Sequence, residues 1–237
     1  MIPLGDSEAP RRFAPANSAL ILANIGVFAL EVRLGPAAAM LGQFAMVPAQ
    51  VAHLDWRTPI ESGLALATLV TSLFLHAGVL HIAGNMLYLF VFGPAVESRT
   101  GHLRFLGFYL AAGVVACLAM VAMAPGSPVP VIGASGAIAG VLGAYFMLYP
   151  RGRIRTILPA YVIPRMVQVP AIFYLLIWFA LQLYSGITSG IRGPLIGGVA
   201  WWAHVGGFLF GVAAAPLIVH KPNRVRYKQA KKKRITS

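Results

Sequence analysis

The apolar residues of this chain are gathered into long blocks, separated by short basic or Pro- and Gly-rich connectors. A helix needs about 20 mostly apolar residues to cross the hydrocarbon of a bilayer. Six blocks approach or reach that length, at residues 17–34, 77–96, 103–124, 133–149, 168–186 and 200–219. Only 11% of the 237 residues are charged, against about 25% in a soluble domain. The sequence therefore predicts an all-α, polytopic membrane protein with six transmembrane helices.

The positive charges orient these spans. If the N-terminus is cytoplasmic, only Arg33, Arg57 and Arg192 of the 19 basic residues fall on the outer side. Basic residues concentrate in cytoplasmic segments, so both termini are expected in the cytoplasm. The predicted organisation is a cytoplasmic N-terminal segment (1–16), a six-helix domain (17–219) and a basic cytoplasmic tail (220–237). Within the domain, one long loop (about 35–76) faces outward.

The net charge of +13 is concentrated partly in that tail, which contains the run KQAKKKR. Such a run could bind RNA or anionic lipid. A topology signal with some attraction to membrane lipid is sufficient to explain it, and no nucleic acid partner is expected. Residues 18–30 could alternatively form a signal peptide, with Ala37, Ala38 and Ala39 as a weak cleavage-like stretch. The single cysteine, Cys117, allows no internal disulfide and is expected in the core.

Three spans that run in the same direction carry polar side chains near the predicted outer boundary. His81 and Asn85 are four residues apart and share one helix face. Ser135 opens the fourth span in the sequence GASG, and His204 lies early in the sixth in WWAHVGG. At 1.5 Å per residue, all lie about 3–6 Å below the boundary. Because polar groups are costly in hydrocarbon, their common depth predicts a single cavity that opens outward.

Small residues recur along the fourth and sixth spans. They are Gly136, Gly140, Gly143 and Ala144 in one, and Gly207, Gly211 and Ala215 in the other. Such stripes let helix backbones approach closely within a membrane. Packing of the two stripes would bring Ser135 within hydrogen-bonding distance of His204.

A serine hydroxyl becomes a nucleophile when a neutral histidine accepts its proton. No carboxylate is expected at the depth of Ser135 and His204, so the prediction is a dyad without a third member. The six acidic residues are Asp6, Glu8, Glu31, Asp55, Glu61 and Glu97. Candidate donors to an oxyanion are His81, Asn85 and the backbone N–H of Ser135 at a helix start. Gly133 and Gly136 beside the serine would let the backbone approach a substrate.

Each residue also has a purely structural interpretation. A serine in a membrane helix often bonds back to a carbonyl, a histidine near the interface often only packs or snorkels, and the pair His81 and Asn85 could simply join helices. A metal site formed by His76, His81 and His204 is conceivable but is not expected, because no carboxylate, thiol or HExxH helix accompanies them. The co-located set, rather than any single residue, favours catalysis.

Three segments together resemble the rhomboid intramembrane serine proteases. They are FLHAGVLHIAGNMLYLFVFGPAVESRTGHLRF, IGASGAIAGVLGAY and AWWAHVGGFLFG, and the resemblance runs from about residue 73 to 215. It implies Ser135 as nucleophile, His204 as general base, and His81 with Asn85 at the oxyanion. It also implies that His76 is the second histidine of the family, one turn above.

The same resemblance assigns structural features. Gly207 and Gly211 match the GxxxG of the last helix, and Glu97 with Arg99 matches a charged pair after the second helix. The outward loop would be half-inserted in the membrane. The fifth helix, near Trp178 and Gln182, would act as a gate, with the loop 185–199 as a lid.

For function, the resemblance implies cleavage of transmembrane segments of membrane proteins near helix-destabilising or small residues, without a cofactor. The compact six-span form is similar to bacterial members and implies a cell inner membrane. The oligomeric state is left open. Two rivals remain: a catalytically silent rhomboid-like protein that binds membrane proteins, and a small transporter, although no inverted repeat is visible.

Two positions depart from the family pattern. Many members carry a tyrosine one turn after the serine, which stacks on the base, and this chain has Ala139 there. The sequence therefore leaves open what orients His204. The pair Trp56 and Arg57 is similar to a family motif, but it lies farther from His81 than that motif does.

Overall fold

The computed structural model describes residues 2–8, 13–35, 42–55, 57–158, 165–192 and 199–219. The predicted basic tail (220–237), Trp56 and the stretch 193–198 of the predicted lid lie outside these ranges. The elements, in chain order, are β1 (Ile2–Asp6), α1 (Pro15–Leu34), α2 (Pro48–Ala52), α3 (Pro59–Thr71), the 3₁₀ turn η2 (Ser72–Phe74), α4 (Val79–Thr100), α5 (His102–Met123), α6 (Ser135–Leu148), β2 (Arg153–Leu158), β3 (Arg165–Pro170), α7 (Ala171–Arg192) and α8 (Trp201–Ile218).

The described chain is a mostly helical bundle of the kind that the sequence predicts. Five of its helices, α1, α4, α5, α7 and α8, are long and apolar enough to cross a membrane. The helix that corresponds to the fourth predicted span, α6, has only 14 residues, or about 21 Å. The protein is therefore a multi-pass membrane protein, and the count of six complete spans stays a prediction.

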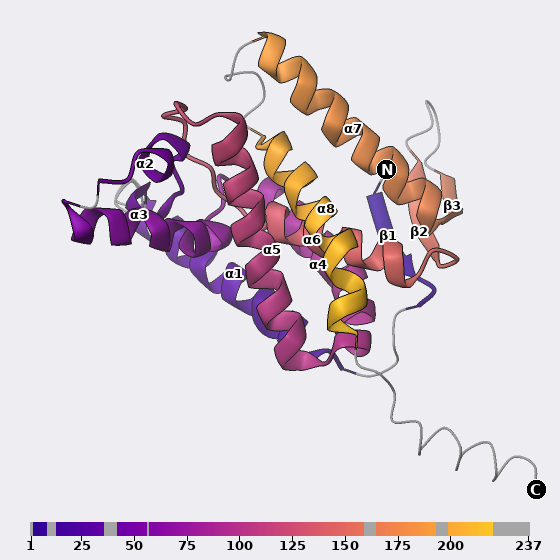
Figure 1. Ribbon diagram of the computed structural model, residues 1–237. Helices are drawn as coiled ribbons and strands as arrows, with labels where there is room; N and C mark the ends of the chain where they lie inside the picture. Colours follow the sequence, from indigo (N-terminus) through magenta and orange to yellow (C-terminus); the bar gives the residue numbers. More distant parts are fainter. Residues whose placement is uncertain are drawn as a thin grey trace, which may run out of the picture.

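The short helix α6 is the centre of the bundle. Every residue from Gly136 to Tyr145 is buried, and Figure 1 shows α6 enclosed by α4, α5 and α8. Non-helical backbone at membrane depth is tolerated where protein covers it. Because its neighbours shield it from lipid, α6 can be shorter than a full span and be preceded by irregular chain.

The helices α6 and α8 pack backbone to backbone, as the small-residue stripes predict. A Cβ atom at Gly207 would overlap the carbonyl oxygen of Gly136, and one at Gly211 would overlap that of Gly140. No side chain larger than hydrogen fits at these two positions. The close approach fixes the relative height of α6 and α8.

The predicted outward loop contains α2, α3 and η2. In Figure 1, α2 and α3 lie on one side of the bundle. The helix α3 packs on α5 but leaves Ile60 and Leu64 exposed by 78% and 64%. Apolar side chains directed outward are consistent with a half-inserted loop, which remains a prediction.

A buried carboxylate lies at the end of the bundle that the charge pattern predicts to face the cytoplasm. Glu97 is 1% exposed and accepts hydrogen bonds from the backbone N–H groups of Ala16 (3.1 Å) and Asn17 (2.7 Å). It therefore caps the start of α1, where helix N–H groups have no partner in the helix. Its side-chain partner is His102, at 2.5 Å; Arg99 instead lies over the ring of Tyr149.

A three-stranded antiparallel sheet, ordered β1-β2-β3, was not anticipated. Ile2 pairs with Ile157, and Arg153 pairs with Pro170. Its strands occupy part of the predicted N-terminal segment and of the basic connector after α6. The signal was present: Arg153 and Arg155 are exposed whereas Ile154 is buried, the period-two alternation of a strand. Consequently α7 begins at Ala171, three residues after the start of the predicted span 168–186, and ends at Arg192, six residues after its predicted end.

Candidate active site

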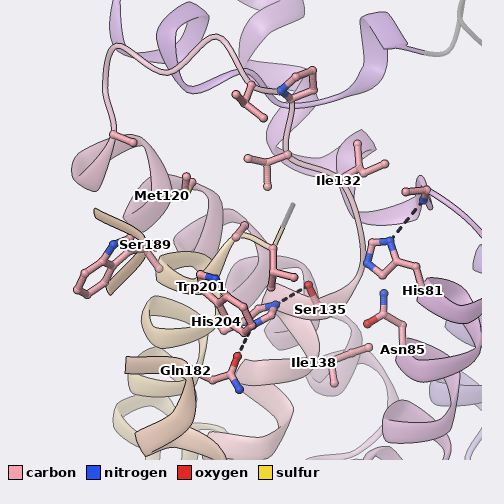
Figure 2. Close-up of a pocket in the computed structure, with 18 of the residues that line it drawn as sticks. His81, Asn85, Met120, Ile132, Ser135, Ile138, Gln182, Ser189, Trp201 and His204 are labelled. Atoms are coloured by element: carbon pink, nitrogen blue, oxygen red, sulfur yellow. Dashed lines mark hydrogen bonds between the residues drawn. The ribbon is translucent and has the colours of Figure 1, made fainter. Parts of the chain in front are cut away.

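The structure brings the two principal candidates together. Ser135 is the first residue of α6, and His204 lies in the first turn of α8. The Oγ atom of Ser135 is 2.8 Å from Nε2 of His204, and Figure 2 shows both side chains at the same cavity. His204 is 8% exposed. A hydroxyl that donates to a neutral imidazole is the arrangement by which a serine is activated for acyl transfer.

The chain before Ser135 is held in place by the outward loop. The backbone N–H of Gly133 donates to the carbonyl oxygen of Ser72 at 2.8 Å, and Met46 and Val131 exchange two backbone hydrogen bonds of 3.2 and 2.7 Å. These bonds connect the irregular segment to η2 and to the start of the loop. The position of Ser135 therefore depends on the loop as well as on α6.

His81 and Asn85 face the same cavity from α4. The backbone N–H of Ala77 lies 3.4 Å from Nδ1 of His81 and donates to it. In a neutral ring the proton is then on Nε2, which makes that nitrogen a donor. The Nδ2 atom of Asn85 donates one hydrogen to Nε2 of His76 at 3.0 Å and carries a second.

Gly133 leaves the space that these donors need. A Cβ atom there would lie 2.8 Å from Nε2 of His81 and 3.5 Å from Nδ2 of Asn85. Its φ angle of +114° is also one that other residues rarely adopt. A side chain at this position would obstruct both donors and strain the backbone before Ser135.

His76 supports Asn85 from behind instead of lining the cavity. Its Nδ1 lies 3.3 Å from the carbonyl oxygen of Phe74, so that Nδ1 donates and Nε2 accepts from Asn85. Burial lowers the pKa of His76 to about 4, and the ring is neutral at pH 7. Its backbone N–H donates to a carboxylate oxygen of Glu31 at 3.2 Å. Glu31 thus lies closer to the site than the sequence indicated, although it does not contact Ser135 or His204.

His204 has a second partner, on the helix that the family resemblance predicts to be a gate. The Nδ1 atom of His204 is 2.8 Å from Oε1 of Gln182 on α7. Two indole rings adjoin the imidazole: Trp178 at 6.0 Å and Trp201 at 6.1 Å between ring centroids. Ala139 is fully buried, and a Cβ atom at Gly207 would lie 3.3 Å from its Cβ. The ring that stacks in many relatives is therefore absent, and α7 and α8 supply the neighbours of His204.

The other glycines that the sequence singles out contribute to helix packing. Gly136, Gly207 and Gly211 lie in the contact between α6 and α8 and do not line the cavity. Among the described residues, no group of three His, Cys, Asp or Glu side chains could hold a metal ion.

The cavity has a volume of about 1080 Å³ and is lined from α4, α5, α6, α7 and α8 and from the irregular segment between α5 and α6. Near Ser135 it is bounded by His81, Asn85 and His204, and deeper by Tyr88, Ile138 and Leu142. A small group of polar side chains within a mostly apolar lining suits a peptide group held beside an apolar side chain.

Comparison with known proteins gives one consistent family. The family model of the Rhomboid domain matches residues 64–221. The chain is 38% identical over 133 residues to the rhomboid protease GluP of Bacillus subtilis (strain 168), covering 55% of this chain and 24% of that protein. It is 35% identical over 116 residues to the putative rhomboid protease YdcA of the same strain, covering 46% and 57%. It is 29% identical over 159 residues to the mitochondrial presenilin-associated rhomboid-like protein of Homo sapiens, covering 64% and 38%. The chain spans less than two thirds of the length of each of these relatives.

Proposed function

Because this chain belongs to the rhomboid family, we propose that it is an intramembrane serine endopeptidase that cleaves transmembrane segments of membrane proteins. Ser135 is the nucleophile and His204 the general base. The observation that carries the proposal is the 2.8 Å contact between Ser135 Oγ and His204 Nε2 at a cavity inside the bundle. By the charge pattern, this cavity opens to the outer side of the membrane. The resemblance to bacterial rhomboid proteases implies that this membrane is a bacterial inner membrane.

The proposed reaction follows acyl-transfer chemistry. As Ser135 Oγ attacks the scissile carbonyl carbon, its proton passes to Nε2 of His204, and the carbonyl oxygen becomes an oxyanion. The imidazolium then protonates the departing amine, which leaves an acyl-serine. His204 next takes a proton from water, and the resulting hydroxide attacks the acyl carbon. The imidazolium returns that proton to Ser135 Oγ as the acyl C–O bond breaks, and the acid product is released.

The oxyanion is stabilised by donors that already face the cavity. These are Nε2–H of His81, the second hydrogen on Nδ2 of Asn85, and the backbone N–H of Ser135 in the first turn of α6. The hydrogen bonds from Ala77 to His81 and from Asn85 to His76 support this assignment, because they fix which atoms carry hydrogen. Donors fixed in advance lose little by reorganising during the reaction.

Replacing Asn85 by alanine is expected to lower kcat about 100-fold with little change in KM, because one oxyanion donor is lost. The measurement is steady-state cleavage in detergent. Asn24→Ala is the matched control: Asn24 is also buried, but its Nδ2 donates to the carbonyl oxygen of Leu20 on the same helix, away from the cavity. If both variants lose the same activity, Asn85 has no special part in the reaction.

The proposed function is tested by reconstituting the protein in liposomes with a transmembrane substrate labelled at both ends. The proposal predicts two fragments, with the cut inside the transmembrane segment on its outer side. A folded protein that binds the segment and leaves it intact would instead support a silent rhomboid-like protein. Ion or solute flux without any cleavage would support a transporter.

A further inference from the structure

The catalytic histidine of a serine hydrolase must present an unprotonated Nε2 to the serine, and the group bonded to Nδ1 decides whether it does. In a Ser-His-Asp triad a carboxylate bonds to Nδ1–H. Among the described residues, no carboxylate is hydrogen-bonded to His204. The partner of Nδ1 is the neutral amide of Gln182, which is 8% exposed.

The orientation of that amide is fixed on its other side. Nε2 of Gln182 donates to the carbonyl oxygen of Trp178, 3.3 Å away and four residues earlier on α7. A rotated amide would place its oxygen against that carbonyl oxygen, and two acceptors would face each other. The oxygen Oε1 therefore points at His204, as Figure 2 shows.

This orientation selects one form of the imidazole. Because Oε1 can only accept a hydrogen bond, Nδ1 of His204 must carry the proton. In the neutral ring Nε2 then holds a lone pair, and it faces the Ser135 hydroxyl at 2.8 Å. The chain of bonds runs from Trp178 through Gln182 and His204 to Ser135, and every donor in it has an acceptor.

The same helix also limits the tilt of the ring. Trp178 and Gln182 are four residues apart and share one face of α7, so one face supplies both the acceptor for Nδ1 and an indole beside the ring. Trp201, on α8, approaches the ring edge to face at 89°. Together these contacts replace the stacking tyrosine whose position is occupied by Ala139.

We propose that Gln182 is a positioning residue, which holds His204 in the Nδ1–H form so that Nε2 accepts the proton of Ser135. The proposal rests on the proposed function above. It has one structural consequence: because Gln182 belongs to α7 while the dyad belongs to α6 and α8, the base is aligned only while α7 is packed against α8.

The first test is Gln182→Met, which keeps the length and much of the volume of the side chain but removes the acceptor. We expect kcat to fall about 10- to 100-fold, less than the roughly 10⁴-fold effect of mispositioning the histidine of a charged triad, while KM changes little. Thr188→Val is the matched control on α7: Thr188 bonds back to the carbonyl oxygen of Tyr184 at 2.9 Å, away from His204. It should keep wild-type kcat.

The second test is Gln182→Glu, which restores an acceptor oxygen and adds a negative charge. It should retain more activity than Gln182→Met. A carboxylate within about 4–6 Å favours the protonated imidazole, and His204 must be unprotonated to act. The acid limb of the kcat profile should therefore move to higher pH, by about one unit. His81 on α4, the other titratable group that acts electrostatically on His204, is unchanged in both variants.

The outcomes separate this inference from the function on which it rests. If the wild-type protein cleaves its substrate while Gln182→Met keeps wild-type kcat and Gln182→Glu keeps the wild-type pH profile, Gln182 does not position the base. If the wild-type protein does not cleave, the proposed function itself fails. A loss of kcat in Gln182→Met that comes with an equal loss in Thr188→Val would show only that α7 needs its polar bonds.

Discussion

Replacing His204 by alanine is expected to lower turnover at least about 10⁴-fold, because removal of the general base alone costs a serine protease nearly as much as removal of the whole catalytic set. The reason in this protein is local. Ser135 has one hydrogen-bonded imidazole, at 2.8 Å, and without it the hydroxyl proton has no acceptor of suitable basicity. The measurement is the rate of fragment formation from a transmembrane substrate under single-turnover conditions.

The control for His204→Ala is His53→Ala, since His53 is exposed in the outward loop and should be dispensable. Folding is checked through Cys117, the single cysteine of the chain, which lies on α5 and is buried against Ser72 of η2. A thiol-reactive dye should label it only on unfolding. Cleavage by His204→Ala near the wild-type rate would mean that another group acts as base, and His81 is the other described imidazole that lines the cavity.

Replacing Gly211 by leucine is expected to destabilise the fold by more than about 3 kcal/mol, the upper end of ordinary overpacking. A Cβ atom at Gly211 would overlap the backbone oxygen of Gly140, and backbone cannot move aside as a flexible side chain does. The helices α6 and α8 would have to separate, and Ser135 with His204 would separate with them. Both the melting temperature, followed by Cys117 labelling, and activity should fall sharply.

Gly107→Leu is the matched control for Gly211→Leu. Gly107 also lies within a long apolar helix, α5, but a Cβ atom there would meet no atom within 4 Å apart from the backbone of its own helix and its chain neighbours. This variant should melt at or above the wild-type temperature. If Gly211→Leu melts with the wild type and remains active, α6 and α8 do not depend on backbone contact, and the account of how the dyad is assembled is wrong.

The helical part of the fold could be predicted because each apolar block extends over many residues and more than one feature of the sequence indicates it. Span length predicts the helices, and the glycine spacing on the fourth and sixth spans predicts their contact. Gly207 and Gly211 lie at the contact of α6 and α8, as that spacing predicts. The short length of α6 is harder to predict from the sequence. A helix that lipid does not cover need not span the full bilayer, and only the packing of its neighbours reveals this.

The sheet and the support of His204 were missed for different reasons. The strand β2 carries a clear alternation at Arg153, Ile154 and Arg155, but its arginines had already been explained as a topology signal. The family resemblance places Gln182 only on the predicted gate helix, and a single glutamine does not reveal which helix it faces. Its bond to Nδ1 of His204 depends on the rotation of α7, and the sequence contains no periodic signal for that rotation.

The central claim is that Ser135 is an activated nucleophile, and covalent labelling tests it most directly. Purified wild-type protein is treated with a serine-reactive fluorophosphonate or isocoumarin, and the modified residue is located by peptide mass mapping. The account predicts a single adduct on Ser135, which Ser135→Ala removes. An adduct on Ser127 or Ser189, the other serines among the described residues that line the cavity, would contradict it. So would the absence of any adduct on protein whose Cys117 is still protected.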